Sequence, residues 1–239
     1  MTLTYLEVTN MALREVNEVP IVAQDFITTR GLQQFAKQAI NRAYLDIVNS
    51  SREWPWLKDK SSTPVHNTVT NVTLGQQSFP LDPLYNQVDW TTFYITDKDL
   101  LLNDSTARKV STGLTYISYE EWTRKYRDED FKEKGSKGLP EFVFMYPDKT
   151  TIGLSPKPDK QYSVQYDAWK SPLFLTLADD LIPFPLEYIT VLISRARYYL
   201  WLFRENPQQA GFARSDYETG LDLMKARLLD NKFVRIKAI

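Results

Sequence analysis

The sequence predicts an α+β fold, in which a four-helix bundle built from N- and C-terminal helical hairpins carries an inserted antiparallel β-sandwich or barrel-like domain. Apolar residues recur at helical spacing towards both ends of the chain, whereas the middle has short apolar runs between turn-forming pairs. A two-helix hairpin cannot bury its apolar stripe alone, so the two distant hairpins are expected to pack together. The expected domains are residues 1–56 with 184–230 for the bundle, 57–183 for the insertion and 231–239 for a C-terminal tail.

The first helical hairpin is predicted from capping residues and apolar spacing. Thr4 and Glu7 stand at capping-box spacing, and the apolar period that follows predicts a helix over about 4–17. A second helix is predicted over about 29–52, closed before Trp54-Pro55-Trp56. Its apolar face consists of Leu32, Phe35, Ala36, Ala39, Ile40, Ala43, Tyr44 and Ile47.

The central region is rich in Thr, Val, Tyr, Phe and Pro and is expected to form many short strands. The strand-like runs are 69–74, 88–96, 108–112, 141–145, 151–154 and 162–169. Ser118 and Glu121 form another capping-box pair, which predicts one helix within this region. The charged stretch 127–138 is expected to be a surface loop.

The helical period returns after Pro183-Phe184-Pro185. It predicts a third helix through about residue 205, after which Asn206 and Pro207 supply an N-cap and a first-turn proline for a fourth. The tail that follows, 231–239, combines basic and apolar residues and contains no acidic residue.

Composition restricts the possible functions. The chain has 239 residues, and 29 Lys and Arg against 30 Asp and Glu give a net charge of −1, which provides no overall attraction to nucleic acid or to an anionic membrane. The absence of Cys excludes disulfides and thiolate metal sites. Apolar runs are short, and Glu7 and Arg14 interrupt the N-terminal pattern, so we expect an unsecreted, soluble chain with no membrane partner.

Catalytic patterns are weak throughout the sequence. His66 is the single histidine and lies in a polar segment, where a solvated role is expected. No nucleophile-elbow or phosphate-loop motif occurs. Asp128-Glu129-Asp130 is interpreted as a solvated loop, and Asp179-Asp180 as turn and helix-entry chemistry. We therefore expect no enzyme activity, no cofactor and no bound metal.

Aromatic residues make up 13% of the chain. Most of those in predicted strands are expected in the core, although an exposed interface or carbohydrate platform stays open as an alternative. In the third helix, Tyr198, Tyr199 and Trp201 extend the apolar surface beyond one stripe. A helix apolar on more than one face usually has two partners, so these three residues are a candidate subunit interface.

The order of several local strings resembles a known family. These strings are Arg52-Glu53-Trp54-Pro55-Trp56, Pro140-Glu141-Phe142-Val143-Phe144, Ile152-Gly153-Leu154-Ser155-Pro156-Lys157-Pro158, Val164-Gln165-Tyr166 and Leu181-Ile182-Pro183-Phe184-Pro185-Leu186-Glu187-Tyr188-Ile189. Across nearly the whole chain, their sequence of strand, Pro-x-Pro turn, strand and proline-led helix is similar to the head-to-tail adaptors of tailed bacteriophages, of the tail tubular protein A type. The charged loop from Arg127 to Lys137 has no counterpart in that pattern.

This resemblance implies a structural protein of the virion neck, assembled in the host cytoplasm. It implies a ring of twelve copies between the portal protein and the tail nozzle or tube, with a channel for passing double-stranded DNA that is not bound sequence-specifically. It also implies that Phe233, Arg235 and Lys237 of the tail dock into the portal. A closed ring needs two different contact surfaces on each subunit, which a near-neutral chain can provide without condensing DNA.

Two other functions are alternatives. The chain could be another tail component, such as a tail completion protein or a carbohydrate-binding module that uses Trp90 or Trp169. A carboxylate-dependent hydrolase would have to use Asp179 and Asp180, the only paired carboxylates placed beside a predicted helix entry.

Overall fold

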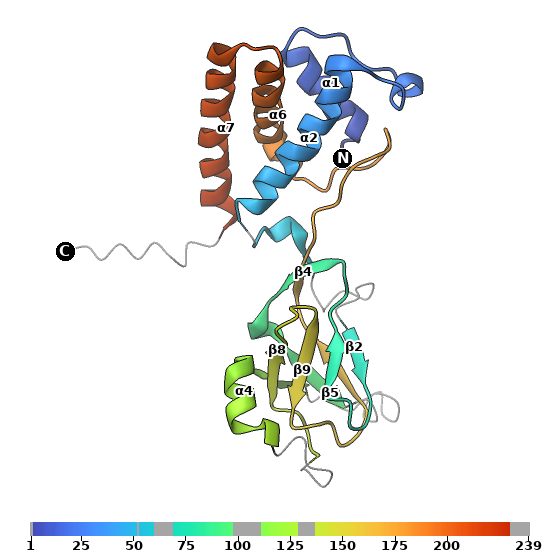
Figure 1. The fold of residues 1–239 in the computed structure, drawn as a ribbon, viewed down its shortest axis with the longest axis vertical. Coiled ribbons are helices and arrows are strands. Elements are labelled where there is room, and N and C mark those ends of the chain that lie inside the picture. Colours follow the sequence, from blue (N-terminus) through green and yellow to red (C-terminus); the bar gives the residue numbers. More distant parts are fainter. Residues whose placement is uncertain (1, 52, 60–68, 98–110, 129–136, 230–239) are drawn as a thin grey trace, which may run out of the picture. The chain divides into compact units, whose positions relative to one another are not determined.

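The computed structural model describes residues 2–51, 53–59, 69–97, 111–128 and 137–229. The chain divides into two compact units. The described parts of Met1–Leu57 and Pro172–Ile239 form a helical unit, and those of Lys58–Ser171 form a strand-rich unit (Figure 1). The predicted mixture of helices and antiparallel-rich sheets is thus confirmed.

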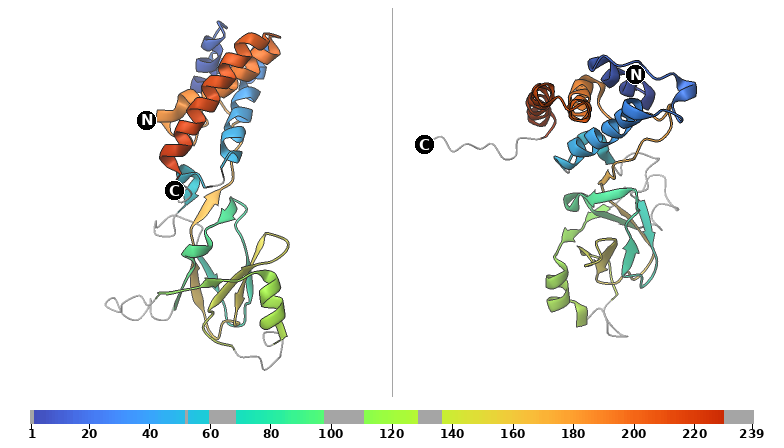
Figure 2. Two further views of the ribbon diagram at one scale, coloured as in Figure 1. Left: turned by 90° about the vertical axis from the view of Figure 1, so that its left-hand side faces the viewer. Right: turned by 45° about the horizontal axis from the view of Figure 1, so that its top comes forward.

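The helical unit is organised around one central helix. Its α-helices are α1 (Tyr5–Glu15), α2 (Gly31–Asn49), α6 (Ile189–Phe203) and α7 (Pro207–Leu228), with 3₁₀ turns at η1 (Ala23–Asp25), η2 (Pro55–Leu57) and η4 (Leu186–Tyr188). Helix α6 packs against α1, α2 and α7, and α1 also packs against α2 (Figure 2). Helix α7 packs mainly along α6. The four helices of this unit therefore pack as pairings centred on α6.

The helix starts follow the capping residues. The Thr4 hydroxyl oxygen accepts the Glu7 backbone N–H at 3.3 Å, and the Glu7 carboxylate accepts the Thr4 backbone N–H at 2.8 Å, which confirms the capping box. At α7, the Asn206 side chain accepts the backbone N–H of Gln209 at 3.1 Å, and Pro207 occupies the first turn as predicted.

The strand-rich unit ends at Ser171, whereas the insertion was expected to end at residue 183. The segment 172–183, assigned above to the insertion, groups with the helices. The first backbone N–H groups of α1 lack intrahelical partners, and two of them bond to this segment: Tyr5 to the Asp180 carbonyl at 2.8 Å and Leu6 to the Ala178 carbonyl at 3.0 Å. The composition of this segment resembles that of the strands, but its hydrogen bonds to α1, far away in the sequence, place it with the helices.

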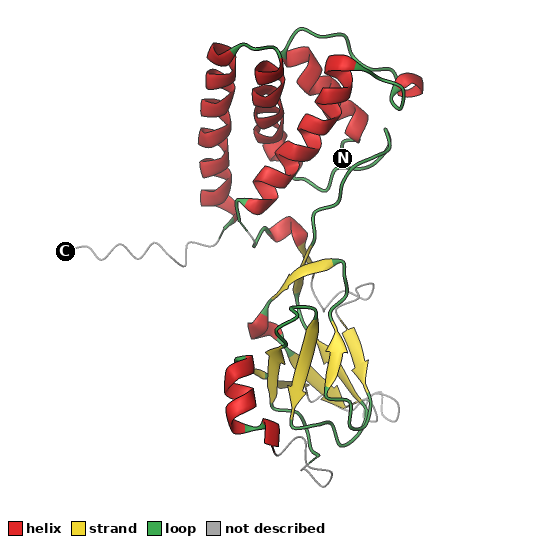
Figure 3. Cartoon of the chain, viewed as in Figure 1, coloured by secondary structure: helices red, strands yellow, loops and turns green. Residues whose placement is uncertain are grey.

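The strand-rich unit contains three small sheets within its described residues (Figure 3). Their orders are β1-β11-β4, β2-β10-β5-β6 and β3-β9-β8-β7, and every pairing is antiparallel except that of β7 with β8. The strands are β1 (Lys58–Asp59), β2 (Val69–Val72), β3 (Ser78–Pro80), β4 (Tyr85–Val88), β5 (Tyr94–Asp97), β6 (Ser111–Gly113), β7 (Thr115–Tyr116), β8 (Phe142–Met145), β9 (Thr151–Ser155), β10 (Tyr162–Gln165) and β11 (Ala168–Lys170).

Two short helical elements complete this unit, η3 (Trp90–Thr92) and α4 (Tyr119–Lys125). The Ser118 hydroxyl accepts the Glu121 backbone N–H at 3.1 Å, which confirms the predicted start of α4. Most of the charged loop 127–138 lies outside the described residues.

Aromatic residues fill the core of the strand-rich unit, as expected. The rings of Phe93 and Tyr166 stack with centroids 4.8 Å apart. A second cluster places Trp122 of α4 on Phe144 of β8 at 4.4 Å. Phe144 pairs across the sheet with Gly153 of β9, and its ring occupies the space that a side chain there would need.

Candidate functional site

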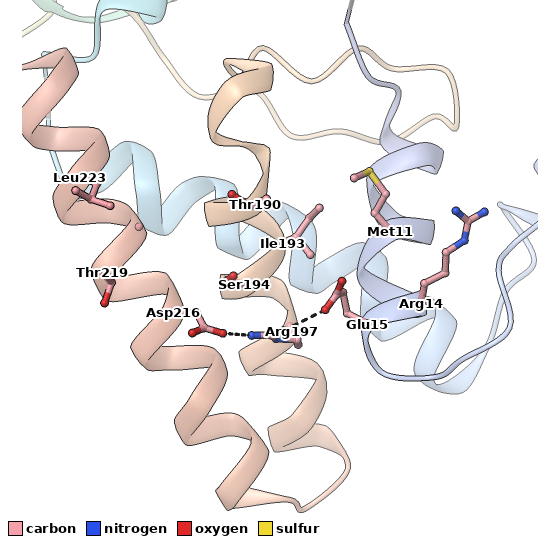
Figure 4. A pocket seen from close by; sticks show the side chains of 11 residues that line it. Met11, Arg14, Glu15, Thr190, Ile193, Ser194, Arg197, Asp216, Thr219 and Leu223 are labelled. Atoms are coloured by element: carbon pink, nitrogen blue, oxygen red, sulfur yellow. Dashed lines mark hydrogen bonds and ion pairs between the residues drawn. The ribbon is translucent and has the colours of Figure 1, made fainter.

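An open groove lies between α1 and α7, with α6 as its floor (Figure 4). We call it the α1–α7 groove; its volume is about 640 Å³. Its apolar part is formed by Met11, Ile193 and Leu223, one residue from each helix. The full lining is Met11, Arg14, Glu15, Thr190, Ile193, Ser194, Arg197, Asp216, Thr219, Gly220 and Leu223.

Arg197 crosses one end of this groove. Its guanidinium bonds to the Glu15 carboxylate of α1 at 3.0 Å and also pairs with the Asp216 carboxylate of α7 (Figure 4). One cation on α6 thus links the two helices that do not pack directly on each other, and it balances part of the acidic charge of the lining. The opposite end contains Met11 of α1 and Leu223 of α7, with Thr190 of α6 between them.

The floor of the groove depends on a close helix contact. A Cβ atom on Gly220 of α7 would lie 2.9 Å from Cγ2 of Val191 on α6. Only a residue without a side chain lets α7 approach α6 at this point without displacing Val191. The position of the α7 wall is therefore fixed by Gly220.

A polar network ties α2 to α6 inside the helical unit. The Asp46 carboxylate accepts a hydrogen bond from Arg195 at 2.7 Å and another from the Tyr199 hydroxyl. Burial and this bond to Asp46 both raise the pKa of Tyr199. The Arg195 guanidinium also lies 4.8 Å from the centres of the Tyr199 and Tyr217 rings, so it is held by stacking as well as by charge.

The three aromatic residues of the candidate subunit interface differ in their exposure to solvent. Tyr199 is only 5% exposed and is engaged by contacts within its own chain. Tyr198 and Trp201 are partly exposed, and each lies beside an arginine: Arg195 for Tyr198 and Arg204 for Trp201. Tyr198 and Trp201 therefore keep surface for a partner.

An exposed apolar loop, residues 173–181, is a surface that the sequence analysis missed. Four of its side chains are between 53% and 67% exposed: Leu173, Phe174, Leu177 and Leu181. The expected turn chemistry of the acidic pair is confirmed for Asp180, because its carboxylate accepts the backbone N–H groups of Thr176 at 2.6 Å and Leu177 at 2.8 Å. These backbone hydrogen bonds lower the pKa of Asp180.

The aromatic candidates of the strand-rich unit are largely covered. Trp169 is 7% exposed, and the ammonium group of Lys58 lies 4.9 Å from the centre of its ring. Trp90 is partly buried, with its ring 5.3 Å from Phe93 and 4.5 Å from Tyr116. A carbohydrate platform needs an open aromatic face, which Trp169 does not offer.

A charged cluster joins the strands at which the chain enters and leaves the strand-rich unit. Lys58 of β1 bonds to Asp89 at 2.8 Å and pairs with Asp167 at 3.4 Å. Buried Asp59 accepts the Tyr85 hydroxyl at 2.8 Å and pairs with Lys170 at 3.2 Å. Each acid therefore has a partner in a neighbouring strand or turn, so the cluster is a structural clamp.

The remaining sequence candidates lie mostly outside the described residues. These are His66, the acidic residues 129 and 130, and Phe233, Arg235 and Lys237 of the tail. Within the described part of the chain, no group of three or more His, Asp or Glu residues could hold a metal ion. No helix among the described residues is both long enough and apolar enough to cross a bilayer.

An open groove and a fixed, exposed apolar loop are surfaces of the kind that contact other proteins. Surfaces of this kind are expected on a protein that assembles with others. A family model, SU10 adaptor protein, matches residues 3–234, which span both units. The chain belongs to the SU10 adaptor protein family and is a bacteriophage structural adaptor, a component of the virion. No curated protein sequence matches it.

Proposed function

We propose that the chain is a tail tubular protein A-like subunit of a ring in the phage neck, where the ring joins the capsid portal to the tail. The observation that carries this proposal is the family match over residues 3–234, which covers the helices at both ends of the chain as well as the strands between them. In this proposal the four helices form a bundle that builds the annulus. The strand-rich unit provides contacts to the tail nozzle or tube.

The proposed ring has twelve copies, matching the symmetry of the portal, and its inner wall lines the channel for double-stranded DNA. The net charge of −1 supports this role. Each phosphate that a wall neutralises adds salt-dependent affinity, so a strongly basic wall would retain the genome. A near-neutral subunit lets DNA pass without sequence-specific binding.

Docking to the portal is assigned to the tail residues Phe233, Arg235 and Lys237. They combine an aromatic anchor with two cations, which suits a partly apolar, partly acidic pocket. Tyr198 and Trp201 are proposed to contribute to contacts between subunits, because both keep exposed surface on α6.

The experiment is sedimentation and negative-stain imaging of the purified chain mixed with the portal ring of the same phage. We expect the two to sediment together and to form a stacked ring with twelvefold symmetry. The matched variant is the triple substitution Phe233→Ala, Arg235→Ala and Lys237→Ala, which should reduce binding to the portal while leaving the circular dichroism spectrum unchanged. A chain that stays monomeric and does not sediment with portal rings would contradict the proposal.

A further inference from the structure

The exposed apolar loop is held in place by hydrogen bonds at Leu175 and within the turn closed by Asp180. The Leu175 backbone N–H donates to the Asn41 side-chain oxygen at 3.0 Å, and the Asn41 amide donates back to the Leu175 carbonyl at 2.9 Å. Leu175 itself is buried. Together with the bonds from Thr176 and Leu177 to Asp180, these contacts fix the loop while its large side chains face outwards.

A fixed apolar surface is well suited to binding. Ordering a flexible segment costs conformational entropy on association, and this loop is already ordered by its bonds to α2 and to its own turn. Exposed clusters of large apolar side chains are otherwise unfavourable on a soluble protein surface. We therefore expect the cluster of Leu173, Phe174, Leu177 and Leu181 to be covered in the assembled state.

The α1–α7 groove offers the complementary shape and chemistry on the same chain. It is concave and apolar around Met11, Ile193 and Leu223, and Leu223 is 56% exposed. The loop and α7 lie at opposite edges of the helical unit in Figure 1, and the second view in Figure 2 agrees. The loop of one copy therefore cannot reach its own groove without leaving its anchor on Asn41.

The two surfaces also carry opposite charges without partners. Arg14 is among the residues that line the groove, and its guanidinium points outwards from α1, away from α6 and α7, in Figure 4. Asp179 is exposed beside Asp180 in the loop. Within the part of the chain that the structure describes, no ion pair or side-chain hydrogen bond engages either group. An unpaired cation at an apolar groove and an unpaired anion in an apolar loop are complementary in charge.

We propose that the exposed apolar loop of one copy packs into the α1–α7 groove of the next copy, with Asp179 facing Arg14. This inference rests on the proposed ring and names the surfaces that would build it. Each copy gives a loop and receives one, so the contact is heterologous and repeats from subunit to subunit until the ring closes. The partner is a second copy because both complementary surfaces occur on every chain.

Cross-linking tests the contact directly, because the natural chain contains no Cys. The full-length variant with Leu177→Cys and Leu223→Cys should form a ladder of disulfide-linked oligomers when rings or virions assemble and are oxidised. Disulfides form only when the two Cα atoms approach within about 4–7 Å, so the ladder reports this contact. A mixture of the two single variants should give a dimer containing one copy of each.

The matched control replaces the loop cysteine with Ile27→Cys, which is also on an exposed apolar residue of the helical unit. With Leu223→Cys it should give no ladder. If rings form from the Leu177→Cys and Leu223→Cys chain but no linked species appears, the assignment of these two surfaces is wrong.

A charge exchange provides an independent measurement that introduces no cysteine. Arg14→Asp or Asp179→Arg alone should lower the association constant between subunits by about fivefold or more, and the double variant should restore most of it. Lys149→Asp, on the strand-rich unit, makes the same change in net charge as Arg14→Asp and should have little effect. Two single variants that associate as tightly as the natural chain would overturn the proposed pairing.

The outcomes separate this inference from the ring proposal on which it rests. If the natural chain forms no oligomer with the portal or in virions, both fail. If it forms rings that neither cross-link nor respond to the charge exchange, the ring stands and only the loop-in-groove contact is rejected.

Discussion

Two glycines show how tightly single residues are packed in this chain. A Cβ atom on Gly153 would lie 2.3 Å from the Phe144 ring, and one on Gly220 would lie 2.9 Å from a Val191 methyl group. Real Cβ contacts are longer, so any side chain at these positions requires its neighbours to move. Close packing makes such movements costly in free energy.

Gly153→Ala is expected to destabilise the strand-rich unit by about 2–3 kcal/mol, because the new methyl group would collide with a ring that is itself packed under Trp122. Thermal unfolding followed by tryptophan fluorescence measures this change. Gly211→Ala in α7 is the control: nothing lies within 4 Å of its Cβ position, and Ala favours a helix over Gly by about 1 kcal/mol. Equal effects of the two substitutions would contradict this account of the packing.

The acidic turn residue Asp180 gives a prediction about pH. Backbone N–H groups of Thr176 and Leu177 hydrogen-bond its carboxylate and lower its pKa in the folded chain. Because the pKa of Asp180 is lower in the folded chain, the ionised carboxylate stabilises the turn at any pH above the ordinary aspartate pKa of about 3.9. This stabilisation is lost as the pH falls through the lower pKa that Asp180 has in the folded chain.

Nuclear magnetic resonance can follow this titration at the two amide groups. The amide proton shifts of Thr176 and Leu177 should titrate together, with a midpoint below about 3.9. Asp180→Asn should abolish the transition, since an amide side chain does not ionise in this range. A midpoint at or above the ordinary aspartate value would show that the two N–H groups do not stabilise the carboxylate.

At the scale of elements, α6 is held to its neighbours by both apolar and charged contacts. Asp46 on α2 receives Arg195 and Tyr199 from α6, and Arg197 of α6 links α1 with α7. The side chains of Asp46 and Arg195 are 30% and 21% exposed, so water screens this pair less than a surface pair. Removing one partner leaves the other charge without full compensation.

Arg195→Met should therefore lower the free energy of unfolding of the helical unit by about 1–3 kcal/mol. Urea denaturation followed by the helical circular dichroism signal measures it. Arg214→Met is the matched control, because Arg214 forms an exposed pair with Glu218 one turn along α7 and its loss should cost less than about 0.5 kcal/mol. If the two variants are equally stable, the Asp46 network contributes no more than a surface ion pair.

The sequence predicted those helix starts that are determined by residues close by in the chain. Thr4 with Glu7, Ser118 and Asn206 each cap the helix that their position indicated. The segment 172–183 was misplaced because its position depends on α1 and Asn41, which lie far away in the sequence. The α1–α7 groove was missed for the same reason, since its three walls come from both ends of the chain.

The burial of single side chains also depended on contacts with residues that are distant in the sequence. The apolar period marked the face of α6 but did not show that Tyr199 would be engaged by Asp46, a residue of another helix. In the exposed apolar loop, Leu175 is buried while its neighbours Phe174 and Leu177 face outwards. No helical or strand period distinguishes these residues, so an outward-facing cluster could not be predicted from the pattern of apolar residues.

At the scale of the whole molecule, the strand-rich unit has the form of an inserted domain. The chain enters it through β1 and leaves it after β11, and these strands are paired, with Lys58 opposite Trp169. The ends of the unit are therefore adjacent in one sheet. Insertions with adjacent ends disturb the host fold little, and they can often fold alone.

A fragment of residues 58–171 is accordingly expected to fold by itself, because its core and its clamp at Lys58 and Asp59 lie entirely within it. It should show a cooperative thermal transition and dispersed amide resonances.

A fragment of residues 60–171 is the control. It lacks β1, so the Tyr85 hydroxyl loses its acceptor Asp59, and Asp89 and Asp167 lose Lys58. An unpaired buried polar group costs about 1–3 kcal/mol, so the shorter fragment should unfold at a clearly lower temperature. Should the longer fragment be unfolded, the strands would need the helices for stability, and the division into two independently folding domains would be wrong.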